Sequence, residues 1–89
     1  MTREELQTAS KLLKDAAEQT TGDVQERLYE QSDQIAALAT RDQGPDHGRL
    51  DRHMNVLHDL ANELDGDVSE KVAEARSQLF EYRKGVPGV

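Results

Sequence analysis

Apolar residues recur along the chain at alternating steps of three and four, which is the spacing of one face of an α-helix. This pattern forms four separate stripes, and each stripe predicts one helix. The stripes are Leu6, Ala9, Leu13, Ala16 and Thr20; Val24, Leu28, Gln31, Ile35 and Leu38; Leu50, His53, Met54, Leu57, Leu60, Ala61 and Leu64; and Val68, Val72, Ala75, Leu79 and Tyr82. The chain is therefore expected to be all-α.

Two short segments of similar sequence separate the helices within each half of the chain. They read Gly22-Asp23-Val24-Gln25-Glu26-Arg27 and Gly66-Asp67-Val68-Ser69-Glu70-Lys71. Glycine readily adopts the left-handed conformation that ends a helix. The aspartate that follows can cap the next helix, and the glutamate three positions later can complete a capping box. Each segment therefore predicts a tight corner, with the second helix starting at Asp23 and the fourth at Asp67.

The remaining helix ends also have sequence signals. Thr2 and Glu5 form a capping box at the start of the first helix. The second helix should end near Arg41, because the connector that follows contains Pro45. Proline lacks an amide hydrogen and disfavours helical geometry in the residue before it. Asp46 is the expected cap of the third helix, and the fourth should end at Lys84–Gly85. The interpretation is one domain, residues 1–89, with one helical hairpin at about 2–41 and another at about 46–84.

The two halves of the chain align when the second is shifted back by forty-four residues. Identical pairs include Leu6/Leu50, Leu13/Leu57, Asp15/Asp59, Ala17/Ala61, Glu26/Glu70, Glu30/Glu74 and Gln34/Gln78. Any two amphipathic hairpins of equal length would align their stripes, but the shared corners favour an internal duplication. With or without duplication, two such hairpins predict an antiparallel four-helix bundle.

The composition predicts a thin hydrophobic core. The chain has 89 residues, of which 35% are hydrophobic, and its aromatic residues are Tyr29, Phe80 and Tyr82. A chain of this size gains little stability from a core of Leu, Val, Ile and Ala alone. Association with a second copy of the chain would bury more apolar surface. We therefore expect a homodimer.

The net charge is −7, from 18 acidic and 11 basic residues. An ordinary helical protein with solvated charged faces would explain this, but we favour adaptation to high salt, where screening removes the repulsion between carboxylates. The chain has no cysteine, no apolar run long enough to span a membrane and no signal-peptide pattern. We expect a cytoplasmic protein that does not contact a membrane.

Motifs of common enzymes and metal sites do not occur in the sequence. There is no Glu-x-x-His or His-x-x-x-His pair, no cysteine nucleophile, no Walker loop and no dinucleotide fingerprint. The serines fall within helical patterns, where a surface or capping role is sufficient. We expect neither catalytic residues nor a metal or cofactor.

One part of the chain is locally basic, at the connector between the hairpins and the start of the third helix. The candidate interaction or anion-binding patch consists of Arg41, Asp46, His47, Arg49, Arg52 and His53. One interpretation is a salt-bridged corner, in which the arginines pair with nearby aspartates. The other is a recognition patch for a protein or an anion on an otherwise acidic molecule. His53 lies on the apolar stripe, so we expect it to be half-buried and hydrogen-bonded.

Two segments resemble a known family. Residues 27–34, Arg-Leu-Tyr-Glu-Gln-Ser-Asp-Gln, and residues 39–50, Ala-Thr-Arg-Asp-Gln-Gly-Pro-Asp-His-Gly-Arg-Leu, are similar to a family of small helical proteins of unknown function from haloarchaea. The resemblance runs over nearly the whole chain. This resemblance implies a cytoplasm with a high salt concentration. It implies no activity, cofactor or catalytic residue.

The sequence supports three functional hypotheses. The first is a non-enzymatic acidic helical protein that acts by binding an unidentified protein partner. The second is a DNA-associated regulator with a helix-turn-helix at one corner, although the acidic outer faces would repel phosphate and make nucleic acid an unfavoured partner. The third is a helical bundle that binds a small molecule or an anion, or an unrecognised enzyme, and it would require a pocket lined by Arg49, His53 and a buried carboxylate.

Overall fold

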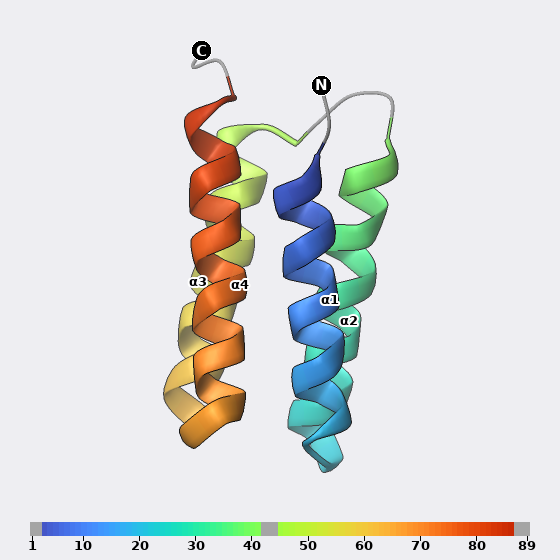
Figure 1. Ribbon diagram of the computed structural model, residues 1–89, viewed down its shortest axis with the longest axis vertical. Coiled ribbons are helices and arrows are strands. Elements are labelled where there is room, and N and C mark those ends of the chain that lie inside the picture. The colour runs from blue at the N-terminus through green and yellow to red at the C-terminus, as the bar shows by residue number, and fades with distance from the viewer. Residues whose placement is uncertain (1–2, 42–44, 87–89) are drawn as a thin grey trace.

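The computed structural model describes residues 3–41 and 45–86, in which all regular secondary structure is helical. The helices are α1 (Glu4–Glu18), α2 (Gly22–Thr40), α3 (His47–Glu63) and α4 (Gly66–Lys84). In Figure 1 the α1/α2 and α3/α4 corners lie at one end of the molecule, while the end of α2 and the start of α3 lie at the other. The prediction of an all-α, four-helix chain is confirmed. None of these helices is long and apolar enough to cross a lipid bilayer.

The helices do not pack equally closely around the bundle. Helix α1 packs along both α2 and α4, and α3 packs along α4. Helices α2 and α3 share no backbone contact of comparable extent, although both lie at the back of the view in Figure 1. The bundle is therefore closed along three interfaces and opened along the fourth, between α2 and α3.

The core is built from the predicted apolar stripes. Its largest fully buried side chains are Leu6, Leu13, Leu28, Ile35, Leu50, Leu57, Leu60, Val72 and Leu79. Each such side chain stabilises the fold by roughly 1.5–3 kcal/mol relative to an exposed position. Tyr82 is buried with them, whereas Phe80, just outside the stripe, is 46% exposed. The stripe spacing thus identifies the inward face of every helix.

Glycine forms both corners as the sequence predicts, but the helix starts differ. Gly22 and Gly66 have φ angles of 71° and 61°, the left-handed region that glycine tolerates best. The predicted caps at Asp23 and Asp67 are wrong, because α2 and α4 begin at the glycines and both aspartates lie inside the first helical turn. There the carboxylates still face the positive end of the helix dipole.

Side chains from the new helix, rather than carboxylate caps, tie each corner together. Gln25 donates its amide hydrogen to the carbonyl oxygen of Ala17 at 2.9 Å. Ser69 donates its hydroxyl hydrogen to the carbonyl oxygen of Ala61 at 2.8 Å. Gln25 and Ser69 are forty-four residues apart, as are Ala17 and Ala61, so the two corners use equivalent positions. This agreement is what an internal duplication would produce, and the duplication itself stays a prediction.

The other helix ends follow the sequence more closely. The carboxylate of Asp46 accepts a hydrogen bond from the backbone amide of Arg49 at 2.8 Å, so the predicted cap of α3 is confirmed. Helix α4 ends at Lys84, as expected. Helix α1 ends at Glu18, two residues before Thr20, the last position of its stripe. The predicted capping box at Thr2 lies outside the described residues.

The α1/α2 interface shows what close helix packing requires in this molecule. Ser10 donates its hydroxyl hydrogen to the carbonyl oxygen of Ser32, and Ser32 donates to the carbonyl oxygen of Ser10, both at 2.8 Å. Such reciprocal bonds form only where small side chains let two backbones approach. Close interfaces in this bundle therefore depend on residues such as serine and alanine.

Candidate functional site

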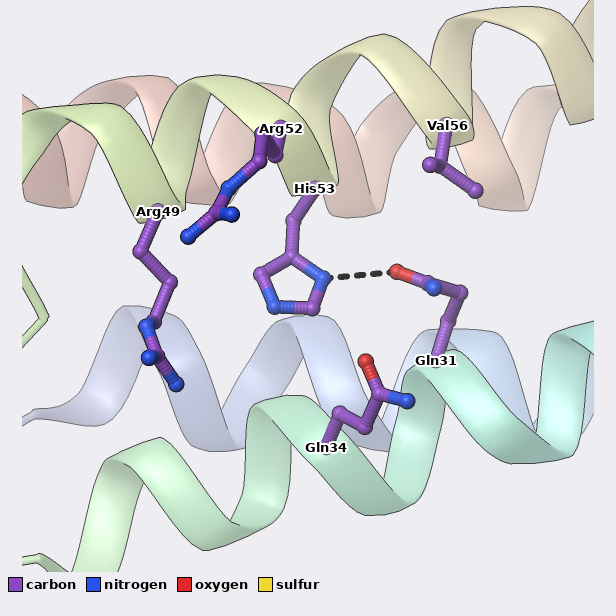
Figure 2. A pocket seen from close by; sticks show the side chains of 6 residues that line it. All are labelled: Gln31, Gln34, Arg49, Arg52, His53 and Val56. Atoms are coloured by element: carbon purple, nitrogen blue, oxygen red, sulfur yellow. Dashed lines mark hydrogen bonds between the residues drawn. The ribbon is translucent and has the colours of Figure 1, made fainter.

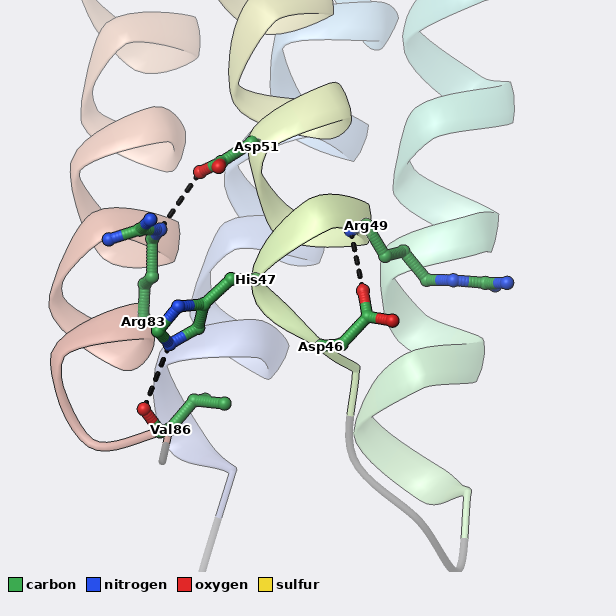
Figure 3. A network of polar contacts seen from close by, with 6 residues as sticks. All are labelled: Asp46, His47, Arg49, Asp51, Arg83 and Val86. Atoms are coloured by element: carbon green, nitrogen blue, oxygen red, sulfur yellow. Dashed lines mark hydrogen bonds and ion pairs between the residues drawn. The ribbon is translucent and has the colours of Figure 1, made fainter. Parts of the chain in front are cut away.

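The residues of the predicted basic patch have different structural roles. Asp46 caps α3, and the ring Nε2 of His47 lies 2.8 Å from the carbonyl oxygen of Val86 (Figure 3). A carbonyl oxygen only accepts, so Nε2 of His47 donates. These two residues hold the start of α3 and attach it to the segment after α4. Arg41 is exposed at the end of α2, and its carbonyl oxygen accepts a hydrogen bond from the guanidinium of Arg3.

Arg49, Arg52 and His53 lie together in a cleft between α3 and α2. The cleft has a volume of about 340 Å³ and is also lined by Val56 on α3 and by Gln31 and Gln34 on α2. The expected buried carboxylate is not among these described lining residues. Figure 2 shows the two guanidinium groups on the side of the His53 ring that faces away from Gln31. The structure therefore brings together three of the six patch residues, and they line the open interface of the bundle.

His53 bridges the cleft through a hydrogen bond to α2. Its Nδ1 lies 2.7 Å from the side-chain oxygen of Gln31, which is itself buried. Because an amide oxygen can only accept, Nδ1 carries the proton, and in the neutral ring Nε2 is left as an acceptor. Burial lowers the pKa of His53 below its ordinary value, and the positive charges of Arg49 and Arg52 lower it further. The expected half-buried, hydrogen-bonded histidine is found.

Neither Arg49 nor Arg52 has an acidic partner in the part of the chain that the structure describes. Asp51, the nearest candidate in sequence, is bound instead to Arg83 of α4 at 2.8 Å (Figure 3). Asp46 binds the backbone of Arg49 and not its guanidinium. The salt-bridged corner is therefore absent from the described residues for these two arginines.

Two large polar residues explain why the α2/α3 interface is open. Under the shift of forty-four residues, this interface corresponds to the α1/α4 interface, with His53 in place of Ala9 and Gln31 in place of Ala75. Both alanines are fully buried, and α1 packs along α4. An imidazole and a carboxamide need more room than two methyl groups, so α2 and α3 stay further apart. The cleft occupies the space beside this polar pair.

The two residues of α2 that line the cleft, Gln31 and Gln34, were not among the predicted site residues. Gln31 carried a signal, because it is a polar residue at an apolar stripe position, where a buried polar group needs a partner. Gln34 and Val56 carried none that separates them from other surface residues. Only the pairing of the two hairpins places the glutamines of α2 opposite the arginines of α3.

Two other hollows lie on the surface of the described residues. A groove of about 410 Å³ between α1 and α2 has Ala36 and Ala39 among its lining residues, together with Lys11 and Lys14. A smaller hollow lies at the corner end of α4 and is mainly acidic. Nowhere in residues 3–41 and 45–86 do three His, Asp or Glu side chains gather in an arrangement that could hold a metal ion. The α2/α3 cleft is distinguished from both hollows by its paired guanidinium groups.

Comparison with known proteins gives one match. The family described as "Family of unknown function (DUF7553)" matches residues 1–85, which is nearly the whole chain. The chain matches no curated protein and no solved structure. The resemblance to a family of unknown function is thus confirmed, and no activity is transferred with it.

Proposed function

The chain belongs to the family of unknown function DUF7553, and we propose that it is a non-enzymatic binding protein that holds an anionic group in the α2/α3 cleft. One observation carries this proposal: two guanidinium groups that have no acidic partner among the described residues lie beside a half-buried histidine and two carboxamides. Guanidinium groups bind oxyanions through parallel hydrogen bonds, and such charge-assisted bonds are about twice as strong as neutral ones.

The charge distribution supports an anionic ligand. Arg49 and Arg52 are three positions apart on one helix, so their charges repel each other by a few tenths of a kcal/mol. The chain has 18 acidic residues, and none of those described pairs with these two arginines. Helix α3 also lacks the acidic first turn found in the other helices, while Arg49 lies near its positive end. A bound anion would relieve these unfavourable interactions.

The size of the cleft limits the ligand. Its volume of about 340 Å³ is close to the lower limit of roughly 300 Å³ for sites that enclose small molecules. The side chains of Arg49 and Arg52 are exposed at its entrance. A small oxyanion, or the anionic group of a larger molecule that remains partly outside, fits this shape.

Calorimetric titration with inorganic phosphate tests the proposal. We expect the unmodified protein to bind, and Arg49→Gln to weaken binding by roughly 10- to 100-fold, because one charge-assisted contact contributes about 1.5–3 kcal/mol. Arg27→Gln is the matched control: Arg27 is an exposed arginine of α2 that is bound to Glu63 at 3.0 Å, outside the cleft. Equal weakening by both substitutions, or no binding by the unmodified protein, would contradict an anion site in the cleft.

The proposed working unit is an antiparallel bundle that forms a homodimer in a high-salt cytoplasm. Phe80 supports self-association because it is 46% exposed, and the groove between α1 and α2 offers a second apolar surface. Light scattering and circular dichroism in low and in multimolar potassium chloride test this part of the proposal. A helical dimer that requires high salt would support it, and a stable folded monomer at low salt would contradict it.

A further inference from the structure

His53 presents a hydrogen-bond acceptor to a cleft that otherwise attracts anions. Its Nδ1 is occupied by the side-chain oxygen of Gln31 at 2.7 Å, and this bond sets the tautomer. In Figure 2 the other ring nitrogen points towards the space bordered by Arg49 and Gln34. In the neutral ring that nitrogen has a lone pair and no hydrogen. A ligand held by the arginines would meet an acceptor at this point.

We propose that His53 accepts a hydrogen bond from a protonated oxygen of the ligand, so that the cleft selects hydrogen phosphate over fully ionised oxyanions such as sulfate. This inference rests on the proposed function. Hydrogen phosphate keeps at least one P–O–H group throughout the neutral pH range, and it can donate that hydrogen to Nε2 while its other oxygens accept from the guanidinium groups. Sulfate has the same shape but no hydrogen, so one of its oxygens would face the lone pair of Nε2 unpaired.

The surroundings of His53 keep the ring neutral. On its own helix, the charged groups of the cleft are Arg49 and Arg52, both of which disfavour a positive ring. Helix α2 contributes the uncharged Gln31 and Gln34, and the acidic Glu30 beside them is bound by the amide of Gln34 at 3.4 Å and does not line the cleft. Helix α4, on the other side of α3, contributes no lining residue.

The same geometry predicts how selectivity depends on pH. When acid protonates His53, Nε2 becomes a donor and can donate a hydrogen bond to any oxyanion. We therefore expect sulfate to bind more tightly as the pH falls and the preference for phosphate to shrink. Methyl phosphate should lose affinity as the pH rises through its second pKa of about 6, because the ester then has no hydrogen left. Inorganic phosphate should keep its affinity over that range, which separates a free phosphate ligand from a phosphate ester.

The test is titration of the protein with phosphate, sulfate and methyl phosphate at about pH 8, well above the ordinary histidine pKa of about 6.5. We expect phosphate to bind roughly 10- to 100-fold more tightly than sulfate, the effect of one hydrogen bond to a charged partner. His53→Asn retains an amide NH₂ near the position of Nδ1, which can still donate to Gln31, and removes Nε2, while its own oxygen stays closer to α3 than Nε2 does. In this variant the phosphate preference should fall to within about threefold.

The outcomes distinguish the two proposals. If the unmodified protein binds neither phosphate nor sulfate, the anion site itself is wrong. If it binds both equally and Arg49→Gln weakens both, the anion site stands and the role of His53 is wrong. A phosphate preference that survives in His53→Asn would also overturn that role. The ¹⁵N chemical shifts of the imidazole provide a second readout, because the inference requires the tautomer with the hydrogen on Nδ1.

Discussion

The α1/α4 and α2/α3 interfaces both lie between the two hairpins and are equivalent under the shift of forty-four residues, yet one is closely packed and the other contains a cleft. Helices α1 and α4 of the closed interface carry Ala9 and Ala75, both fully buried. At the equivalent positions of the open interface are His53 and Gln31, which are joined by a hydrogen bond. At these two positions, large polar side chains accompany an open interface and small apolar ones a closed interface.

The comparison extends to the residues at the entrance of the cleft. Arg49 and Arg52 correspond to Glu5 and Thr8 under the shift of forty-four residues. The equivalent positions on α1 are thus small or acidic, whereas those that line the cleft on α3 are large and basic. The cleft and the positive charges of Arg49 and Arg52 occur together at the α2/α3 interface. For this reason we propose that anion binding takes place there.

The largest expected effect comes from introducing a large polar residue into the closed interface. Ala75→Gln should destabilise the protein by about 4 kcal/mol, because it overpacks the contact and buries a carboxamide that has no partner such as His53. Urea denaturation measures the change in the free energy of unfolding. Ala73→Gln is the control, since Ala73 is exposed on the same helix and should change stability by less than about 0.5 kcal/mol. Equal stabilities of the two variants would show that the interface is not closely packed.

The next effect concerns the charge of the open interface. The double substitution Arg49→Glu and Arg52→Thr gives the cleft the residues of the closed interface. We expect phosphate affinity to fall by at least about 100-fold, or about 3 kcal/mol, since two charge-assisted contacts are lost and a carboxylate is added. Calorimetric titration at constant salt measures this loss. Retention of affinity would place the anion elsewhere on the molecule.

A smaller effect is expected when the open interface is made apolar. Replacing both Gln31 and His53 by leucine removes a polar pair from a partly buried position. We expect this double variant to be as stable as the unmodified protein or more stable by about 1 kcal/mol, because apolar replacement of a buried polar pair is often neutral or stabilising. The single variant Gln31→Leu should be less stable than the double one, since it leaves Nδ1 of His53 unpaired. Thermal unfolding of both variants tests this order.

The smallest effect is the pH dependence that His53 gives to folding. Its pKa is lowered in the folded protein, so below the ordinary value of about 6.5 the unfolded chain binds a proton that the folded protein does not. The free energy of unfolding should therefore decrease as the pH falls through about 6.5 towards the lower folded pKa, and it should be unaffected by His53 above that range. Denaturation at several pH values should show a weaker decrease in His53→Asn. Identical pH profiles would contradict this role.

Much of the fold could be predicted from the sequence because it depends on local spacing. The stripes identified the buried faces, and Gly22 and Gly66 identified the corners through their backbone freedom. The caps at Asp23 and Asp67 were mispredicted because a left-handed glycine can itself begin the assigned helix, which moves the aspartate into the first turn. Here a residue motif identified the corner correctly but not the first residue of the next helix or its hydrogen bonds.

The site could be predicted only in part. Arg49, Arg52 and His53 are close in sequence on one helix, so their grouping follows from helical geometry. Gln31 and Gln34 belong to the other hairpin, and their position opposite the arginines depends on how the hairpins pack. Asp51 also shows this limit, because its partner Arg83 comes from α4 and not from the neighbouring arginines.

The most direct test of whether the two interfaces differ in anion binding is a phosphate titration of the ¹⁵N-labelled protein. The binding is monitored through the backbone amide resonances. We expect the chemical shifts to change in α3 around Arg49–Val56 and in α2 around Gln31 and Gln34, with little change near Ala9 and Ala75. Changes centred on Ala9 and Ala75, or no saturable change in any helix, would contradict the conclusion that the α2/α3 interface is the binding site.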